Sequence, residues 1–284
     1  MIPVAAEKLF DVGPLPVTNS LLTGWVIVAL FALLAWRLNR SVRQVPSGLQ
    51  NVSEFVLERL LEFSDQVTGD RRRTRRFLPL VGGIFIFILA CNWLSLLPGV
   101  GSIGVWMDVH GERELVPIFR AATSDLNLTL AMGISAVALS NIFGIFAVGF
   151  FRHWGRFVQV AGIWRAVRQF GRKPFGQAMM GLAVAFIELA VGFIELVSEA
   201  AKIVSLSLRL FGNVFAGEVL LYVFFSLIGY VIPALFVVME LVVGLVQAII
   251  FATLTLVYLT IATDSPHGSE QGEKNEPVPA NQSP

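Results

Sequence analysis

Seven ionisable side chains lie within the last two hydrophobic regions of the sequence. They are Glu188, Glu195, Glu199, Lys202, Arg209, Glu218 and Glu240. A charged residue at the centre of a membrane helix costs roughly 2.5–3.5 kcal/mol on insertion scales, and it usually faces protein or water and serves a transport pathway. The first three hydrophobic segments contain no charge, so the intramembrane chemistry is expected in the last two.

Four of these charges, Glu188, Glu195, Lys202 and Arg209, recur at seven-residue intervals. Because seven residues are close to two helical turns, the four form one stripe on a helix, drifting by only about 20° per step. Asn213 continues the stripe four residues later. One helix face is therefore predicted to be acidic in its N-terminal half and basic in its C-terminal half.

Other polar groups pair with this stripe or face elsewhere. Glu199 lies three residues before Lys202, so the two are predicted to form an ion pair. A purely structural pair and a functional one are equally good interpretations. Glu240 and Gln247 are seven residues apart and share a face of the last hydrophobic region.

Arg209 is the charge that is hardest to explain structurally. It is the only charge between residues 203 and 217, and a guanidinium cannot release its proton there. Glu218 lies nine residues further on, about half a turn round, so it faces another direction. Glu218 and Glu240 are carboxylates in apolar surroundings and are predicted proton carriers. Gly212, Ala216 and Gly217 are predicted to let another helix approach closely, and ordinary helix packing and a special role are equally good interpretations.

Five segments are apolar enough to cross a membrane, which takes about 20 residues: 21–36, 77–97, 128–151, 179–230 and 234–262. The fourth is too long for one upright span and is expected to be tilted, bent or partly interfacial. The sequence therefore predicts an all-α polytopic membrane protein with about five membrane-crossing helices. Its predicted divisions are an external segment at 1–20, a membrane channel domain at 21–264 and a disordered cytoplasmic tail at 265–284.

Composition agrees with a lipid environment. Of 284 residues, 55% are hydrophobic and 14% charged, mean hydropathy is +0.73 and net charge is +1. An ordinary soluble enzyme is excluded, because a soluble domain carries roughly 25% charged residues. Near-zero net charge argues against nucleic acid as a partner. Cys91 is the one cysteine, so neither a disulfide nor a cysteine cluster for zinc is possible within the chain, and we expect no metal and no cofactor.

Lys and Arg set the expected orientation. They are concentrated between the first and second spans and between the third and fourth, whereas the loop at 100–127 is more acidic. By the positive-inside rule the two basic loops are cytoplasmic, which puts the N-terminus outside and the C-terminus inside.

A shorter amphipathic helix is predicted at 46–66, between the first two spans. Ser47 and Gln50 have capping-box spacing, and apolar residues from Leu49 to Phe63 recur at helical intervals on one face. This helix is too polar to cross the membrane. It either lies at the cytoplasmic interface or packs on a partner.

Residues 205–221 read SLSLRLFGNVFAGEVLL, which resembles the signature of subunit a of F-type ATP synthases, the stator half of their membrane ion channel. Further similarities are DLNLT at 125–129, NWLSLLP at 92–98 and the run from 245 to 259. The resemblance implies that the last two helices are long, tilted and wrapped around a ring of c subunits. It also implies that the amphipathic helix lies along the membrane surface.

The resemblance assigns a role to each polar group. Arg209 matches the essential arginine that faces the c-ring carboxylate and blocks leakage, and Gln247 matches a glutamine close to it. Glu195 matches an acid of the cytoplasmic-side channel. Glu218, with Asn213 nearby, matches a carboxylate of the external-side channel.

Glu240 stands where several bacterial members of the family carry histidine. A carboxylate there can still relay protons, and two neighbouring carboxylates can share one proton.

The implied partners are the c-subunit ring, the b subunits of the peripheral stalk, the lipid bilayer and a transported ion, H⁺ or Na⁺. The implied location is the bacterial inner membrane. The subunit itself would be a non-catalytic channel component with no ATP site of its own.

Two other function classes use the same charges. A stand-alone secondary transporter would show broken helices or inverted repeats, and neither is evident in the sequence. An intramembrane enzyme needs a nucleophile, base or metal constellation, and the three histidines, at 110, 153 and 267, lie outside the spans.

Overall fold

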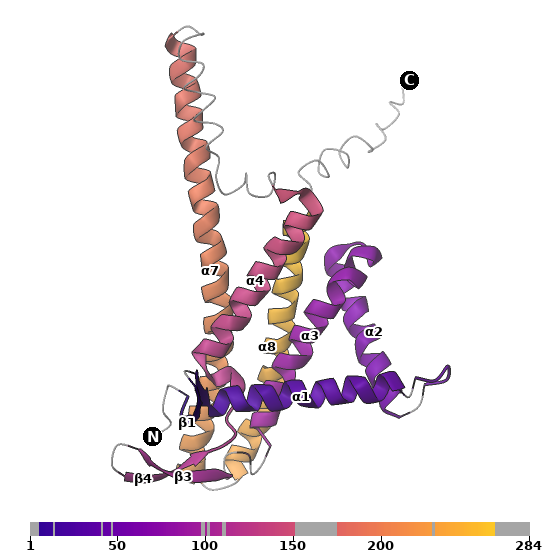
Figure 1. Cartoon of the computed structure of the whole chain (residues 1–284), viewed down its shortest axis with the longest axis vertical. Helices are drawn as coiled ribbons and strands as arrows, with labels where there is room; N and C mark the ends of the chain where they lie inside the picture. Colours follow the sequence, from indigo (N-terminus) through magenta and orange to yellow (C-terminus); the bar gives the residue numbers. More distant parts are fainter. Residues whose placement is uncertain are drawn as a thin grey trace, which may run out of the picture. The chain divides into compact units, whose positions relative to one another are not determined.

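The computed structural model describes residues 6–13, 15–40, 42–46, 48–97, 100, 103–109, 112–150, 175–228 and 231–264. Its helices (Figure 1) are α1 Asn19–Arg40, α2 Leu49–Thr68, α3 Arg71–Ser95, α4 Leu126–Val148, α7 Phe175–Ile228 and α8 Val231–Thr263. Five of these, all except α2, are long and apolar enough to cross a membrane. The all-α polytopic fold is therefore confirmed. The predicted tail and most of the basic loop after the third span lie outside the described residues.

Two of these helices, α1 and α3, extend beyond the predicted apolar segments because charged residues continue them. The clearest case is α3, which begins six residues before the apolar run that starts at Phe77. Asp70 is its N-cap, and the Asp70 side chain accepts a hydrogen bond from the backbone N–H of Arg72. Such a cap satisfies one of the free N–H groups of the first turn, so the basic residues from Arg71 onwards form helix rather than loop.

α7 is one continuous helix of 54 residues. At 1.5 Å per residue its axis is about 80 Å long, whereas the hydrocarbon core of a bilayer is about 30 Å thick. This length agrees with the prediction that the region cannot be one upright span. α8 begins at Val231, and Pro233 lies in its first turn, where its missing N–H costs no helical hydrogen bond.

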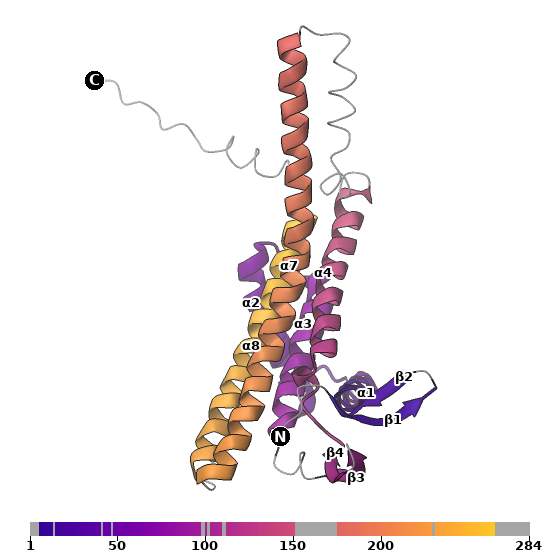
Figure 2. The same ribbon diagram turned by 90° about the vertical axis from the view of Figure 1, so that its left-hand side faces the viewer.

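The C-terminal half of α7 and most of α8 form an antiparallel pair, visible in Figures 1 and 2. The rings of Phe224 and Phe236 stack with centroids 4.3 Å apart. Further along, the Asn213 side chain donates to the Gln247 side chain at 2.9 Å. The residue numbers of both contacting pairs add up to the same total, so the register of the two helices is constant over this length.

Two short antiparallel hairpins, which the sequence did not predict, flank the helices. The first pairs β1 Lys8–Val12 with β2 Leu15–Thr18. The second pairs β3 Gly104–Val109 with β4 Glu112–Pro117. A 3₁₀ turn, η2 Ala122–Ser124, follows the second hairpin. These elements matter because they deliver the segment 118–125 to the start of α1, which contacts η2 and β2.

The chain divides into two compact units. Unit 1 contains residues 1–137 and 200–257, and unit 2 contains residues 138–199 and 258–284. In unit 1, α3 buries one helical stripe of apolar side chains that includes Phe77, Val81, Phe85 and Ile88. Most of the predicted site residues belong to this unit.

The amphipathic helix α2 forms a hairpin with α3 and contacts it. Gly69 ends α2 in the left-handed conformation, with φ of 67°, and Arg71 at the start of α3 forms an ion pair with Asp65 of α2. This ion pair lowers the pKa of Asp65 below its ordinary value of 3.8. Ser47, the first member of the predicted capping box, lies outside the described residues. Gly48 is the N-cap, and the Gln50 side chain bonds both backbone groups of Arg43, so Gln50 does not close a capping box.

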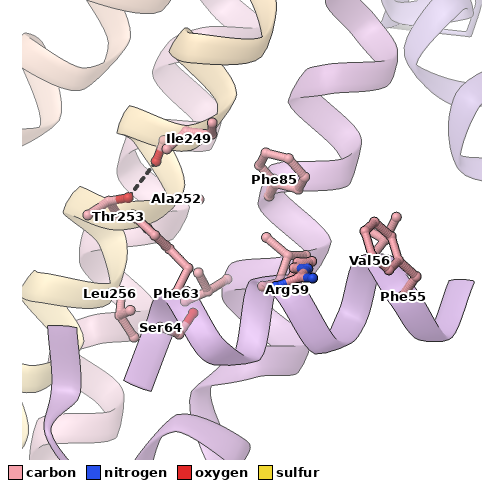
Figure 3. Close-up of a pocket in the computed structure, with 12 residues that line it drawn as sticks. Phe55, Val56, Arg59, Phe63, Ser64, Phe85, Ile249, Ala252, Thr253 and Leu256 are labelled. Atoms are coloured by element: carbon pink, nitrogen blue, oxygen red, sulfur yellow. Dashed lines mark hydrogen bonds between the residues drawn. The ribbon is translucent and has the colours of Figure 1, made fainter. Parts of the chain in front are cut away.

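The apolar face of α2 borders a cavity of about 300 Å³ between α2, α3 and α8 (Figure 3). The lining residues are Phe55, Val56, Arg59, Leu60, Phe63, Ser64, Val81, Phe85, Ile249, Ala252, Thr253 and Leu256. The Thr253 hydroxyl donates to the Ile249 carbonyl within α8, at 2.7 Å, so it adds little polarity to the cavity. α2 thus packs at least partly on helices of its own chain, an arrangement that the sequence did not predict.

Candidate functional site

Arg209 lies on the exposed side of α7. Its neighbours Leu206 and Leu210 are buried, whereas Arg209 and Asn213 are exposed. The Arg209 Nη2 atom lies 3.5 Å from the hydroxyl oxygen of Ser205, one turn earlier on the same helix. The guanidinium is therefore directed away from the core of unit 1 and towards the space that a partner could occupy.

Asn213 and Gln247 link α7 to α8 one turn beyond Arg209, through the 2.9 Å hydrogen bond described above. Gln247 is only 3% exposed. Its side-chain nitrogen has no hydrogen-bond partner among the described residues. The structure thus bonds Gln247 of α8 to Asn213, which lies one turn beyond Arg209 on α7.

Glu218 forms an ion pair with Arg120, whose Nη2 lies 3.4 Å from Glu218 Oε2. The side chains of Arg120 and Glu218 are 8% and 21% exposed. The two residues are 98 positions apart in the sequence. This arginine was missed, because its charge was counted only as a feature of the external loop. A signal was present: Arg120 is flanked by the apolar run from 115 to 119 and by Ala121 and Ala122.

Glu240 of α8 completes a cluster with these two residues. Its carboxylate lies against Gly217 of α7, and it occupies the space that a Cβ atom on that glycine would need. The charges of Glu240 and Glu218 are close enough to interact. The close approach predicted at Gly217 is thus made by a side chain, and the cluster contains two carboxylates and one guanidinium.

Buried polar groups at the start of α1 hold the segment that carries Arg120. The Thr23 hydroxyl accepts the backbone N–H of Arg120 at 3.3 Å, and the Asn19 amide donates to the Pro117 carbonyl at 3.3 Å. The Ser20 hydroxyl donates to Asp125 at 2.7 Å. All three α1 side chains are almost completely buried, so the backbone of Arg120 is fixed from the N-terminal helix.

Asn92 of α3 holds the other side of the cluster. Its side-chain nitrogen donates to the Gly244 carbonyl of α8 at 3.2 Å, and its oxygen accepts from the Thr123 hydroxyl at 2.7 Å. A Cβ on Gly244 would lie 3.0 Å from that of Asn92, so the close approach requires glycine. The Trp93 indole donates to the Leu241 carbonyl at 3.1 Å. These bonds fix α8 next to Glu240.

The remaining acids of the predicted stripe belong to unit 2. There the Asn141 side chain donates to Glu199 at 3.2 Å, and Glu188 and Glu195 are half-buried. Lys202 is half-buried in unit 1. The ion pair between Glu199 and Lys202 stays a prediction.

A family model described as ATP synthase A chain matches residues 20–260. The chain belongs to this family. It is 29% identical to ATP synthase subunit a of Moorella thermoacetica, over 91% of this chain and 97% of that one. It is 28% identical to ATP synthase subunit a of Gloeobacter violaceus, over 93% and 91%. It is 31% identical to ATP synthase subunit a of Campylobacter jejuni subsp. doylei, over 84% and 87%.

The predicted resemblance is therefore confirmed, and so is a multi-pass membrane location. Membership in this family favours a stator subunit of the F-type ATP synthase over the stand-alone secondary transporter and the intramembrane enzyme.

Proposed function

We propose that this chain is the ion-translocating stator subunit of an F-type ATP synthase, with Arg209 as the gate between two access half-channels to the c-ring. The observation that carries this proposal is the placement of Arg209. It is a permanent cation within an apolar helix, and its side chain is exposed whereas the neighbouring Leu206 and Leu210 are buried. Such a charge needs a carboxylate on a partner.

In this proposal the c-ring carboxylate is ionised when it faces Arg209 and protonated when it faces lipid. The fixed positive charge attracts the ionised form and repels a cation that would cross directly between the half-channels. Rotation is therefore required for each ion that passes. Gln247 and Asn213 lie beside the gate as uncharged hydrogen-bonding groups.

The external half-channel in this proposal uses Glu218 and Glu240, and the cytoplasmic half-channel uses Glu195. Support for the external part comes from the Glu240 carboxylate lying against Gly217, the residue next to Glu218, because neighbouring carboxylates can share and pass a proton. We propose H⁺ as the transported ion, with Na⁺ as the alternative. The proposed partners are the c-ring and the peripheral-stalk b subunits, in a bacterial inner membrane, with the N-terminus external and the C-terminus cytoplasmic.

The test is ATP-driven pumping in inverted membrane vesicles, followed with a pH-sensitive dye with and without Na⁺. Arg209→Ala should abolish pumping while the subunit still inserts, because removing the charge lowers the insertion cost. Arg209→Lys should also fail or nearly fail, because an ammonium does not reproduce a planar fork. Leu208→Ala, a neutral truncation at the adjacent exposed position, is the matched control. Near-normal coupled pumping by Arg209→Ala would overturn the proposal.

A further inference from the structure

We infer that Arg120 is a positioning residue of the external access site. It orients the carboxylate of Glu218 and supplies the positive charge that lets Glu218 and Glu240 together exchange a single proton. This inference rests on the proposed function and adds to it a residue of the external loop.

The geometry of the ion pair is the first support. The guanidinium comes from the segment between β4 and η2, and the carboxylate comes from the C-terminal quarter of α7. The two partners are therefore positioned by separate elements. Their atoms lie 3.4 Å apart and both side chains are largely buried. Arginine keeps its charge at any pH that a protein experiences. Among the described residues, Glu218 forms an ion pair with Arg120.

The charge balance is the second support. Three charged groups contribute here: Arg120 from the loop forms an ion pair with Glu218 of α7, and the carboxylate of Glu240 of α8 lies against Gly217, the residue next to Glu218. With one proton on the two carboxylates the cluster is neutral, and without it the net charge is −1. If an uncharged residue replaced Arg120, the same proton exchange would change the net charge of the cluster between −1 and −2. In largely apolar surroundings this is far less favourable. Arg120 thus makes one proton, and only one, easy to exchange.

The contacts indicate which of the two carboxylates carries the exchangeable proton. Glu218 is the carboxylate in contact with the guanidinium and is therefore the ionised member of the pair. Glu240 has Gly217 as its neighbour on α7 and no guanidinium in contact among the described residues. We therefore assign the exchangeable proton to Glu240, with Glu218 as the fixed counter-charge of Arg120.

The scaffold of Arg120 is the third support. Its backbone N–H is held by the Thr23 hydroxyl, and the preceding Pro117 carbonyl is held by Asn19. Both α1 side chains are buried. An arginine whose only role was to influence the orientation of the loop would need no such anchoring, because its guanidinium would be in water.

The test is a double-mutant cycle at matched subunit levels in inverted vesicles. Arg120→Gln and Glu218→Gln should each lower pumping at least tenfold, because each leaves one charge of a buried pair without its partner. The double variant Arg120→Gln/Glu218→Gln should pump several-fold better than either single variant, because both charges of the pair are gone and Glu240 again exchanges one proton between neutral and −1. Arg120→Lys should keep part of the activity, because the charge remains.

Arg113→Gln, at the other arginine of the same external loop, is the matched control and should pump normally. If Arg120→Gln fails to accumulate, the comparison of Glu218→Gln with the double variant still decides. A double variant that pumps no better than the worse single variant, or an Arg120→Gln subunit that pumps normally, would overturn the inference. Arg209→Ala is measured in parallel, because normal pumping there would refute the proposed function itself rather than the role of Arg120.

Discussion

Replacing Gly217 by alanine should stop most ion transport without unfolding the subunit. The Cβ atom would take the place now occupied by the Glu240 carboxylate. That carboxylate is the end of a flexible side chain, so it can swing away at a rotamer cost of about 0.5–1.5 kcal/mol. Replacing glycine by alanine inside a helix stabilises the folded protein by roughly 0.5–1 kcal/mol. The two terms nearly cancel, so the stability of the subunit should change by less than about 1 kcal/mol.

Transport should be far more sensitive than stability. Moving the Glu240 carboxylate off Gly217 separates it from Glu218, and a misplacement of about 1 Å at a reacting group can cost on the order of a hundredfold in rate. We expect pumping by Gly217→Ala to fall ten- to a hundredfold, while the thermal stability of the purified complex stays the same. Gly83→Ala is the matched control, because no described atom lies within 4 Å of a Cβ at that exposed position of α3.

A second variant separates displacement of the carboxylate from a general packing effect. Asp is one methylene shorter than Glu, so Gly217→Ala/Glu240→Asp makes room for the new Cβ and should pump better than Gly217→Ala alone. The reasoning is refuted if Gly217→Ala keeps more than half of the normal pumping rate. It is also refuted if the loss follows the amount of subunit in the membrane.

Two further predictions concern the α2–α3 junction and the orientation. Because Arg71 lowers the pKa of Asp65, the stabilisation from this ion pair is fully present above the ordinary value of 3.8 and is lost as the pH falls through the lowered value. Amide hydrogen exchange at 65–74, corrected for its intrinsic pH dependence, should therefore become faster at acid pH in the wild type but change little in Asp65→Asn. In a Cys91→Ser background, a cysteine at Val45 should react with impermeant reagents from the cytoplasm and one at Ile103 from outside, and the reverse result at either site would refute the orientation.

The helices were predictable because a long apolar run is a local property of the sequence. The five spans follow from hydrophobic length alone, and the length of α7 follows from the absence of a breaker before residue 229. The β3–β4 hairpin was missed because its charged residues were counted only for their effect on orientation. The cap of α2 was misassigned because Gln50 has a better partner in the backbone of Arg43, a contact that a capping rule does not consider.

The site residues that share a face of one helix were predictable from the sequence, whereas the contacts between separate elements were not. Seven-residue spacing identified the stripe that includes Arg209 and the shared face of Glu240 and Gln247, because spacing defines a helical face. The pairing of Glu218 with Arg120 joins residues 98 positions apart, and no pattern within one sequence specifies such a contact. A buried arginine in an external loop is visible only after the loop has been placed.

The polar contacts of the first helix have a consequence for biogenesis. Ser20 of α1 acquires its partner Asp125 only after 105 more residues have been added to the chain. At roughly 5–20 residues per second, α1 reaches the membrane many seconds before Asn19 can bond Pro117 and Ser20 can bond Asp125. We expect the polar first turn of α1 to stay at the membrane surface during this interval, because unsatisfied groups are costly in lipid. Docking of the newly made loop onto this turn then sets the position of Arg120, so the proposed external pathway should become competent only as a late step in assembly.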